Sequence, residues 1–205
     1  MKNTNFIFTM LLLIGINHKV SSQAVSISTT DCGTYTQDFN GLGTTSGTWT
    51  DNVTISNWYS KRSGTGVTIT AGTGSSITGD LYNFGVAADN DRALGSVGSG
   101  GAEAGNFAWG VMMQNNSGQT ISAMTVAYTG EQWRNSGETV AQTCAFYYQV
   151  SSTPITDLQP NNNSAWTTVS MLDFASPIFG GSAGNLDGNY QANRIIINAV
   201  SIPGI

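Results

Sequence analysis

The clearest fold signal in the chain is the stretch FAWGVMMQNNSGQTISAMTVAY, residues 107–128. Apolar side chains recur at every second position in both of its halves, at Phe107, Trp109, Val111 and Met113 and then at Met124, Val126 and Tyr128. This period-two alternation predicts two β-strands that each bury one face. Residues 115–118, NNSG, have the composition of a hairpin-type turn between them.

A third strand is predicted at residues 141–150, where Cys144, Phe146 and Tyr148 share a face. Three consecutive strands with short connections predict an antiparallel meander. Outside it, short apolar runs separated by Gly, Ser and Asn predict further strands at residues 35–39, 55–59, 67–71, 80–84, 166–172 and 194–202. No helix is expected after residue 24. The fold class is therefore all-β, an antiparallel β-sandwich that is jelly-roll-like, with the apolar strand 194–202 in its interior.

The N-terminus has the layout of a secretory signal peptide. Lys2 precedes an apolar run of 11 residues, 6–16, and small residues then allow cleavage after Ser22 or Ala24. A run this short cannot cross about 30 Å of hydrocarbon as a helix. We expect residues 1–24 to be removed and residues 25–205 to form one β-sandwich module that is secreted, extracellular or at the cell surface, with no membrane span.

The other end of the chain carries a turn signal, Pro203-Gly204-Ile205, directly after a predicted core strand. A turn normally leads into another strand, and stopping there leaves a neighbouring edge unpaired. We therefore expect the module to be truncated at this end and to lack its last strands.

Composition excludes several function classes. His18, the only histidine, lies in the expected signal peptide, so the mature chain has no imidazole for a catalytic triad, a Cys-His pair or a metal ligand. Five basic residues then face twelve acidic ones, a net charge of −7, and the only adjacent cations are Lys61 and Arg62. Nucleic-acid binding needs clustered cations and is not expected. A non-catalytic role is expected.

Carboxylates are the remaining groups for catalysis, as in glycoside hydrolysis. The candidates are Asp89, Asp91, Glu103, Glu131 and Glu138. No closely spaced acidic signature lies on a strand, and Asp in a turn commonly makes local backbone hydrogen bonds. A stand-alone glycosidase is therefore the weaker hypothesis, and it requires two carboxyl groups facing each other at about 5–9.5 Å.

A structural calcium ion is the one cofactor that the residues suggest. Asp89 and Asp91 in one loop and Asp187 in another offer hard oxygen ligands, although neither loop has the full DxDxDG pattern.

The two cysteines, Cys32 and Cys144, either form a disulfide in an oxidising compartment or leave Cys144 as a buried thiol.

Aromatic residues are the candidate ligand-binding residues. Trp58 and Tyr59 lie at a predicted strand end, and Trp133 and Arg134 combine a flat ring with a fork of donors. These four residues suggest a polysaccharide or cell-surface glycan as partner. The alternative for each aromatic is core or edge packing. For Arg134 it is pairing with Glu131 or Glu138 over an aromatic ring at a strand-to-loop junction.

Five runs carry a family resemblance: YTQDFNGLGTTSGTWTDN (35–52), LYNFG (81–85), DRALGS (91–96), YTGEQWRN (128–135) and LDGNYQANR (186–194). The chain resembles a secreted β-sandwich module of extracellular proteins from Bacteroidetes and some other bacteria, and YTGEQWRN is the most specific run. The resemblance implies a module that often precedes nuclease, phosphatase or lamin-tail-like domains or a type IX sorting tail. It implies no activity, and the aromatic strand and Asp-rich segment that end the module are absent here.

Two functions follow as hypotheses. The first is a non-catalytic secreted module that binds glycan or contributes to adhesion. The second is a structural N-terminal module of a larger secreted hydrolase, a nuclease or a phosphatase, whose catalytic domain lies outside this sequence.

Overall fold

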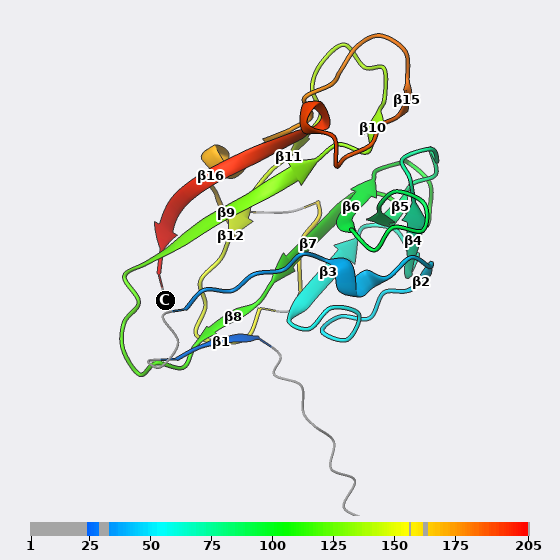
Figure 1. Ribbon diagram of the computed structural model, residues 1–205. Coiled ribbons are helices and arrows are strands. Elements are labelled where there is room, and N and C mark those ends of the chain that lie inside the picture. Colours follow the sequence, from blue (N-terminus) through cyan, green and yellow to red (C-terminus); the bar gives the residue numbers. More distant parts are fainter. Residues whose placement is uncertain (1–23, 29–32, 156, 162–163, 205) are drawn as a thin grey trace, which may run out of the picture.

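The structure of the protein is a computed structural model that describes residues 24–28, 33–155, 157–161 and 164–204 (Figure 1). Within these ranges the chain is all-β and sandwich-like, as predicted, with mostly antiparallel pairings and no α-helix. The strands are β1 (Val25–Ile27), β2 (Gly47–Thr48), β3 (Trp58–Arg62), β4 (Thr68–Gly72), β5 (Asp80–Phe84), β6 (Ala93–Val97), β7 (Phe107–Val111), β8 (Met113–Asn115), β9 (Ala123–Glu131), β10 (Arg134–Asn135), β11 (Thr143–Cys144), β12 (Tyr147–Tyr148), β13 (Thr167–Thr168), β14 (Phe174–Ala175), β15 (Gly184–Asn185) and β16 (Arg194–Pro203). Three 3₁₀ turns complete the elements, η1 (Asn40–Leu42), η2 (Ser170–Leu172) and η3 (Gln191–Asn193).

The largest sheet has four strands in the order β2-β4-β5-β6. Its central strand, β5, is buried at all five positions because both faces of the sheet are covered. On one face Leu81 packs with Trp49 and Ile69, and partly buried side chains from β3 and β7 close this cluster. On the other face Tyr82 and Phe84 pack with Trp133. The pairing of β4 with β5 is parallel, and the other two pairings in the sheet are antiparallel.

The longest ladder joins β9 and β16, which run side by side in Figure 1. Its register starts at Arg194 opposite Glu131 and ends at Pro203 opposite Ala123, with a bulge between Ile197 and Val200. Their inner face forms a third core cluster around Leu172, Ile197 and Ile202. Residues 194–202 therefore form the predicted strand, but the prediction that both of its faces are buried is wrong, because Ile196 is 71% exposed on the uncovered face.

The predicted meander is wrong, although its first two strands exist. β7 pairs with β3, β8 pairs with β1 in parallel, and β9 pairs with β16. The side chain of Asn115 accepts the Ser117 N–H and donates to the Gln119 carbonyl, so the predicted turn closes on itself without bringing β8 against β9. Residues 141–150 form only β11 and β12, whose partners are β14 and β13.

Three further strand predictions need correction or adjustment. Residues 35–39 form no strand. The Gln37 and Asp38 side chains accept the backbone N–H groups two residues ahead, of Phe39 and Asn40, and Phe39 has a left-handed φ of 61°. The strand predicted at 55–59 begins later, as β3, and the one at 166–172 is β13 followed by η2. β6 was not predicted at all. The predictions at 67–71 and 80–84 are confirmed as β4 and β5.

Candidate functional site

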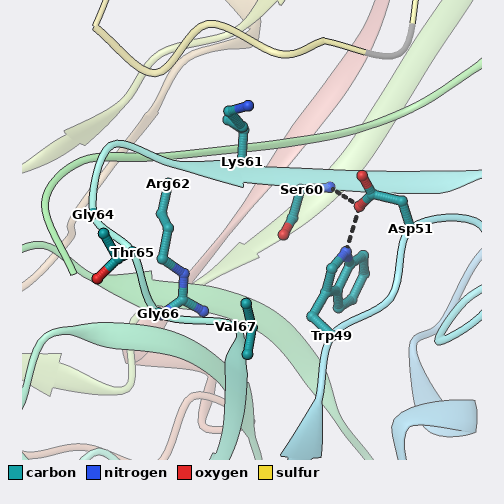
Figure 2. A pocket seen from close by; sticks show the side chains of 9 residues that line it. All are labelled: Trp49, Asp51, Ser60, Lys61, Arg62, Gly64, Thr65, Gly66 and Val67. Carbon is teal, nitrogen blue, oxygen red and sulfur yellow. Dashed lines mark hydrogen bonds between the residues drawn. The ribbon is translucent and has the colours of Figure 1, made fainter. Parts of the chain in front are cut away.

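An open pocket of about 300 Å³ lies beside β3 (Figure 2). It is lined by the loop after β2, the end of β3 and the loop that joins β3 to β4, through Trp49, Asp51, Ser60, Lys61, Arg62, Gly64, Thr65, Gly66 and Val67. This volume lies at the lower end of the range of about 300–1,000 Å³ for small-molecule sites. The pocket therefore admits a small ligand unit.

The Asp51 carboxylate is held in a defined orientation. Its Oδ1 accepts the indole N–H of Trp49 at 2.7 Å and the backbone N–H of Ser60 at 2.9 Å, both drawn in Figure 2. The loop that carries Asp51 is in turn closed by a hydrogen bond from the Asn52 N–H to the Trp58 carbonyl. Because both hydrogen bonds from described residues end on Oδ1, Oδ2 remains available to a ligand donor.

Both cations of the pocket are paired with carboxylates. The Lys61 ammonium lies 3.3 Å from Asp157, and both side chains are more than half exposed. The Arg62 guanidinium lies 2.7 Å from Asp80, and these two side chains are only 8% and 10% exposed. Arg62 also donates to the Thr68 carbonyl and lies 5.0 Å from the centre of the Phe107 ring. Arg62 is thus committed to the fold, whereas Lys61 stays accessible.

The loop between β3 and β4 is fixed by backbone contacts. The N–H groups of Gly64, Thr65 and Gly66 donate to the carbonyls of residues 102–104 at 2.9–3.1 Å. A Cβ at Gly64 would stand 2.5 Å from the carbonyl carbon of Glu103, so only glycine allows this approach. The loop is therefore held in place, and the Thr65 hydroxyl adds a further hydrogen bond to the Ala102 carbonyl at 3.5 Å.

The chemistry of this arrangement is hydrogen bonding to a polar ligand. The lining includes the Asp51 carboxylate, which accepts hydrogen bonds, and the Ser60 hydroxyl, which both donates and accepts. The Thr65 hydroxyl already donates to the Ala102 carbonyl at 3.5 Å, and Lys61 extends on the opposite side of β3 from Ser60 and Arg62 (Figure 2). Trp49 contributes an apolar wall but little open ring face, because it is 9% exposed. Asp51 is the single carboxylate among the nine lining residues, whereas glycoside hydrolysis uses two.

Trp58 and Tyr59, predicted as ligand-binding residues, border this pocket without lining it. The Trp58 indole N–H donates to the Tyr35 hydroxyl at 2.8 Å, and its ring packs edge-on against Phe39. Tyr59 is 6% exposed, and desolvation, with a contribution from Asp51, raises the pKa of its hydroxyl. Both residues pack and position the strand that carries Ser60.

Trp133 and Arg134 lie elsewhere, beside the second core cluster. Trp133 is 4% exposed, stacks parallel on Phe84 at 6.1 Å and donates its indole N–H to Glu131 at 3.1 Å. A Cβ at Gly188 would stand 2.4 Å from the indole nitrogen, so glycine backbone covers the ring.

Arg134 donates to the carbonyls of residues 74 and 75. Among the described residues it forms no ion pair with Glu131 or Glu138, so that expected pairing is wrong.

Two of the three predicted calcium ligands, Asp91 and Asp187, act electrostatically on Glu131. Desolvation raises the pKa of Glu131, Asp91 and Asp187 raise it further, and the Trp133 N–H and Arg194 oppose the shift. The Asp89 and Asp187 carboxylates each accept a backbone N–H two residues ahead, as in a turn. In the part of the chain that the structure describes, no three His, Cys, Asp or Glu residues group as metal ligands. The described residues therefore do not form a ligand set for the predicted calcium ion.

The disulfide stays a prediction because Cys32 lies outside the described residues. Cys144 is an exposed residue of β11, opposite Phe174. Desolvation around the sulfur, with a contribution from Asp173, nevertheless raises the pKa of its thiol.

Sequence reasoning missed the polar residues of the pocket, Asp51, Ser60 and Thr65. One local signal was present, since Trp49 and Asp51 stand two residues apart, the spacing across which the indole N–H meets the carboxylate. Nothing in the sequence brings the loop after β2 to the loop between β3 and β4, because the sheet pairing of β2 with β4 does so.

A search against protein-family models found no match for this chain, and neither the curated proteins nor the solved structures yielded a similar one.

Proposed function

We propose that the protein is a secreted, non-catalytic β-sandwich module that binds a glycan in the pocket beside β3. The observation that carries the proposal is the oriented carboxylate of Asp51, held by the Trp49 indole N–H and the Ser60 backbone N–H in a pocket of about 300 Å³ that Ser60 also lines. A sugar presents several hydroxyls that each donate and accept, and this lining supplies both kinds of partner.

Orientation of Asp51 supports binding because it lowers the entropy lost when a ligand docks. A side chain already held by two hydrogen bonds has little rotamer freedom left to lose. The recognition is chiefly polar, since Trp49 exposes little of its ring. The single carboxylate of the lining supports binding rather than hydrolysis, which needs a second carboxyl group across the ligand.

Secretion is part of the proposal and rests on the signal-peptide layout of residues 1–24. Among the described residues, no helix combines the length and apolar character needed to cross a membrane.

Substitution of Asp51 by asparagine is expected to weaken glycan binding about tenfold or more, the cost of losing a charged hydrogen-bond partner. The amide oxygen can still accept the two hydrogen bonds that hold the loop, so the fold is retained. The purified chain is screened on a glycan array, and the affinity for any binder is measured by titration calorimetry for the wild type and Asp51→Asn.

Glu138→Gln is the matched control, because Glu138 is an exposed carboxylate outside the pocket lining. It should bind as the wild type does. An array without any binder, or equal losses in Asp51→Asn and Glu138→Gln, would refute the proposal and favour the structural-module hypothesis.

A further inference from the structure

Resting on the proposed function, we infer that the pocket selects uncharged sugar chains over chains that carry carboxylates or sulfates. The basis is the charge left in the pocket after its ion pairs are counted. Lys61 and Arg62 are the only cations of the lining, and each faces its own carboxylate, Asp157 and Asp80. Asp51 is the remaining charge, and it is negative.

The charge of Arg62 is neutralised more completely than that of Lys61. Its guanidinium and the Asp80 carboxylate are almost fully buried against each other, and the Thr68 and Thr70 hydroxyls also donate to that carboxylate at 2.6–3.0 Å. Arg62 further donates to the Thr68 carbonyl and covers Phe107. An anionic ligand would have to break this set of contacts to recruit the guanidinium.

The Lys61 charge is neutralised at the pocket rim. Its ammonium lies 3.3 Å from Asp157, which does not line the pocket. Because both side chains are well exposed, the pair is in contact with solvent, and Lys61 extends on the side of β3 opposite to Ser60 and Arg62 (Figure 2). Asp157 sets the charge of this rim without forming part of the lining.

An anionic sugar unit would therefore meet the Asp51 carboxylate with no unpaired cation to offset it. Two like charges at about 4 Å in water repel by an amount that lowers an equilibrium constant about fivefold. The net charge of −7 on residues 25–205 adds a longer-range repulsion of the same sign. An uncharged polyol has neither penalty and uses Asp51 as an acceptor for its hydroxyls.

The test compares a neutral polymer with a carboxylated polymer of the same cellulose backbone, hydroxyethyl cellulose with carboxymethyl cellulose, by affinity electrophoresis of the purified chain. The neutral member of the pair should bind about fivefold or more tightly. Raising the salt from about 0.05 M to about 0.5 M should reduce this ratio, because exposed charges are screened. A ratio that favours the acidic member would overturn the inference.

Asp157→Asn supplies an internal check because it unpairs Lys61 without altering the lining. It should shift the neutral-to-acidic ratio about fivefold toward the acidic polymer, while Glu138→Gln should leave the ratio as in the wild type. An unchanged ratio in Asp157→Asn would contradict the inference. Preferential binding of the acidic polymer at a site that depends on Asp51 would also overturn the inference of charge selection but would leave the proposed glycan binding intact. If the chain binds neither polymer and nothing on the glycan array, both the inference and the proposed function are refuted.

Discussion

Substitution of Asp80 by asparagine is expected to lower the free energy of unfolding by about 3–5 kcal/mol at pH 7, because it leaves a buried arginine without its counter-charge. The Asp80 carboxylate accepts hydrogen bonds from Arg62, Thr68, Thr70 and its neighbour's backbone N–H. An asparagine has one acceptor oxygen in place of two and cannot satisfy this set. Urea denaturation followed by tryptophan fluorescence measures the loss.

The same contacts determine how the loss depends on pH. Burial alone would raise the pKa of Asp80, but the hydrogen bonds from Thr70, Thr68, Arg62 and Leu81 outweigh it and hold the pKa below its ordinary value of 3.8. The contribution of Asp80 to stability is therefore fully present above that value and is lost as the pH falls through the lower, folded-state pKa.

The stability difference between wild type and Asp80→Asn should thus be constant from neutral pH down to about 5 and shrink below about 4. Asp157→Asn is the matched control, since its pair with Lys61 is exposed and should contribute no more than about 1 kcal/mol. A difference that grows on acidification, or equal losses in the two variants, would contradict this account of the buried pair.

Substitution of Trp133 by alanine is the second large effect, with an expected loss of about 3–5 kcal/mol. The indole is 4% exposed and forms the end of a stack in which Phe84 lies between it and Tyr82, with ring separations of 6.1 and 4.8 Å. Removing it leaves a cavity against the four-stranded sheet and deprives Glu131 of the indole N–H.

This prediction separates the two roles considered for Trp133. Truncation of a core residue lowers the stability and leaves the glycan affinity of the remaining folded protein unchanged. Truncation of a ligand-binding residue lowers the glycan affinity and leaves the stability unchanged. Urea denaturation and calorimetric titration with the array binder are measured on the same variant. Tyr190→Ala serves as control, because Tyr190 is 66% exposed and should change stability by no more than about 0.5 kcal/mol. Unaltered stability in Trp133→Ala would refute the core role.

The individual strands were predictable to the extent that local pattern decides them. Residues 80–84 and 67–71 formed strands as predicted, because apolar residues and threonine at these positions fit a pleated, buried surface. Residues 35–39 did not, since the Gln37 and Asp38 side chains there accept the backbone N–H groups two residues ahead and the left-handed Phe39 ends the extended run. Residues 141–150 contain strand residues in two short pieces only, set by separate partners.

Which strands pair with each other was not predictable from local pattern. The strand at Phe107–Val111 has the alternation of a hairpin partner for the next strand, yet it pairs with β3, about fifty residues earlier. Period-two alternation indicates that one face of a strand is buried, but it does not indicate which other strand pairs with it or which element covers that face. The candidate site has the same limitation, because Trp58, Tyr59, Trp133 and Arg134 were selected by residue type, and side-chain type does not distinguish a packed aromatic from an exposed one.

By itself, the sequence determined the all-β class, the absence of histidine after His18 and the excess of carboxylates over cations, since these depend on composition and local periodicity alone. Tertiary structure decided which carboxylate each cation faces. Arg62 of β3 meets Asp80 of β5, and Asp51 accepts hydrogen bonds from Trp49 and Ser60 and forms no ion pair with a cation among the described residues. The ion pairs of Arg62 with Asp80 and of Lys61 with Asp157 join residues that are distant in the chain, and no local pattern in the sequence encodes them.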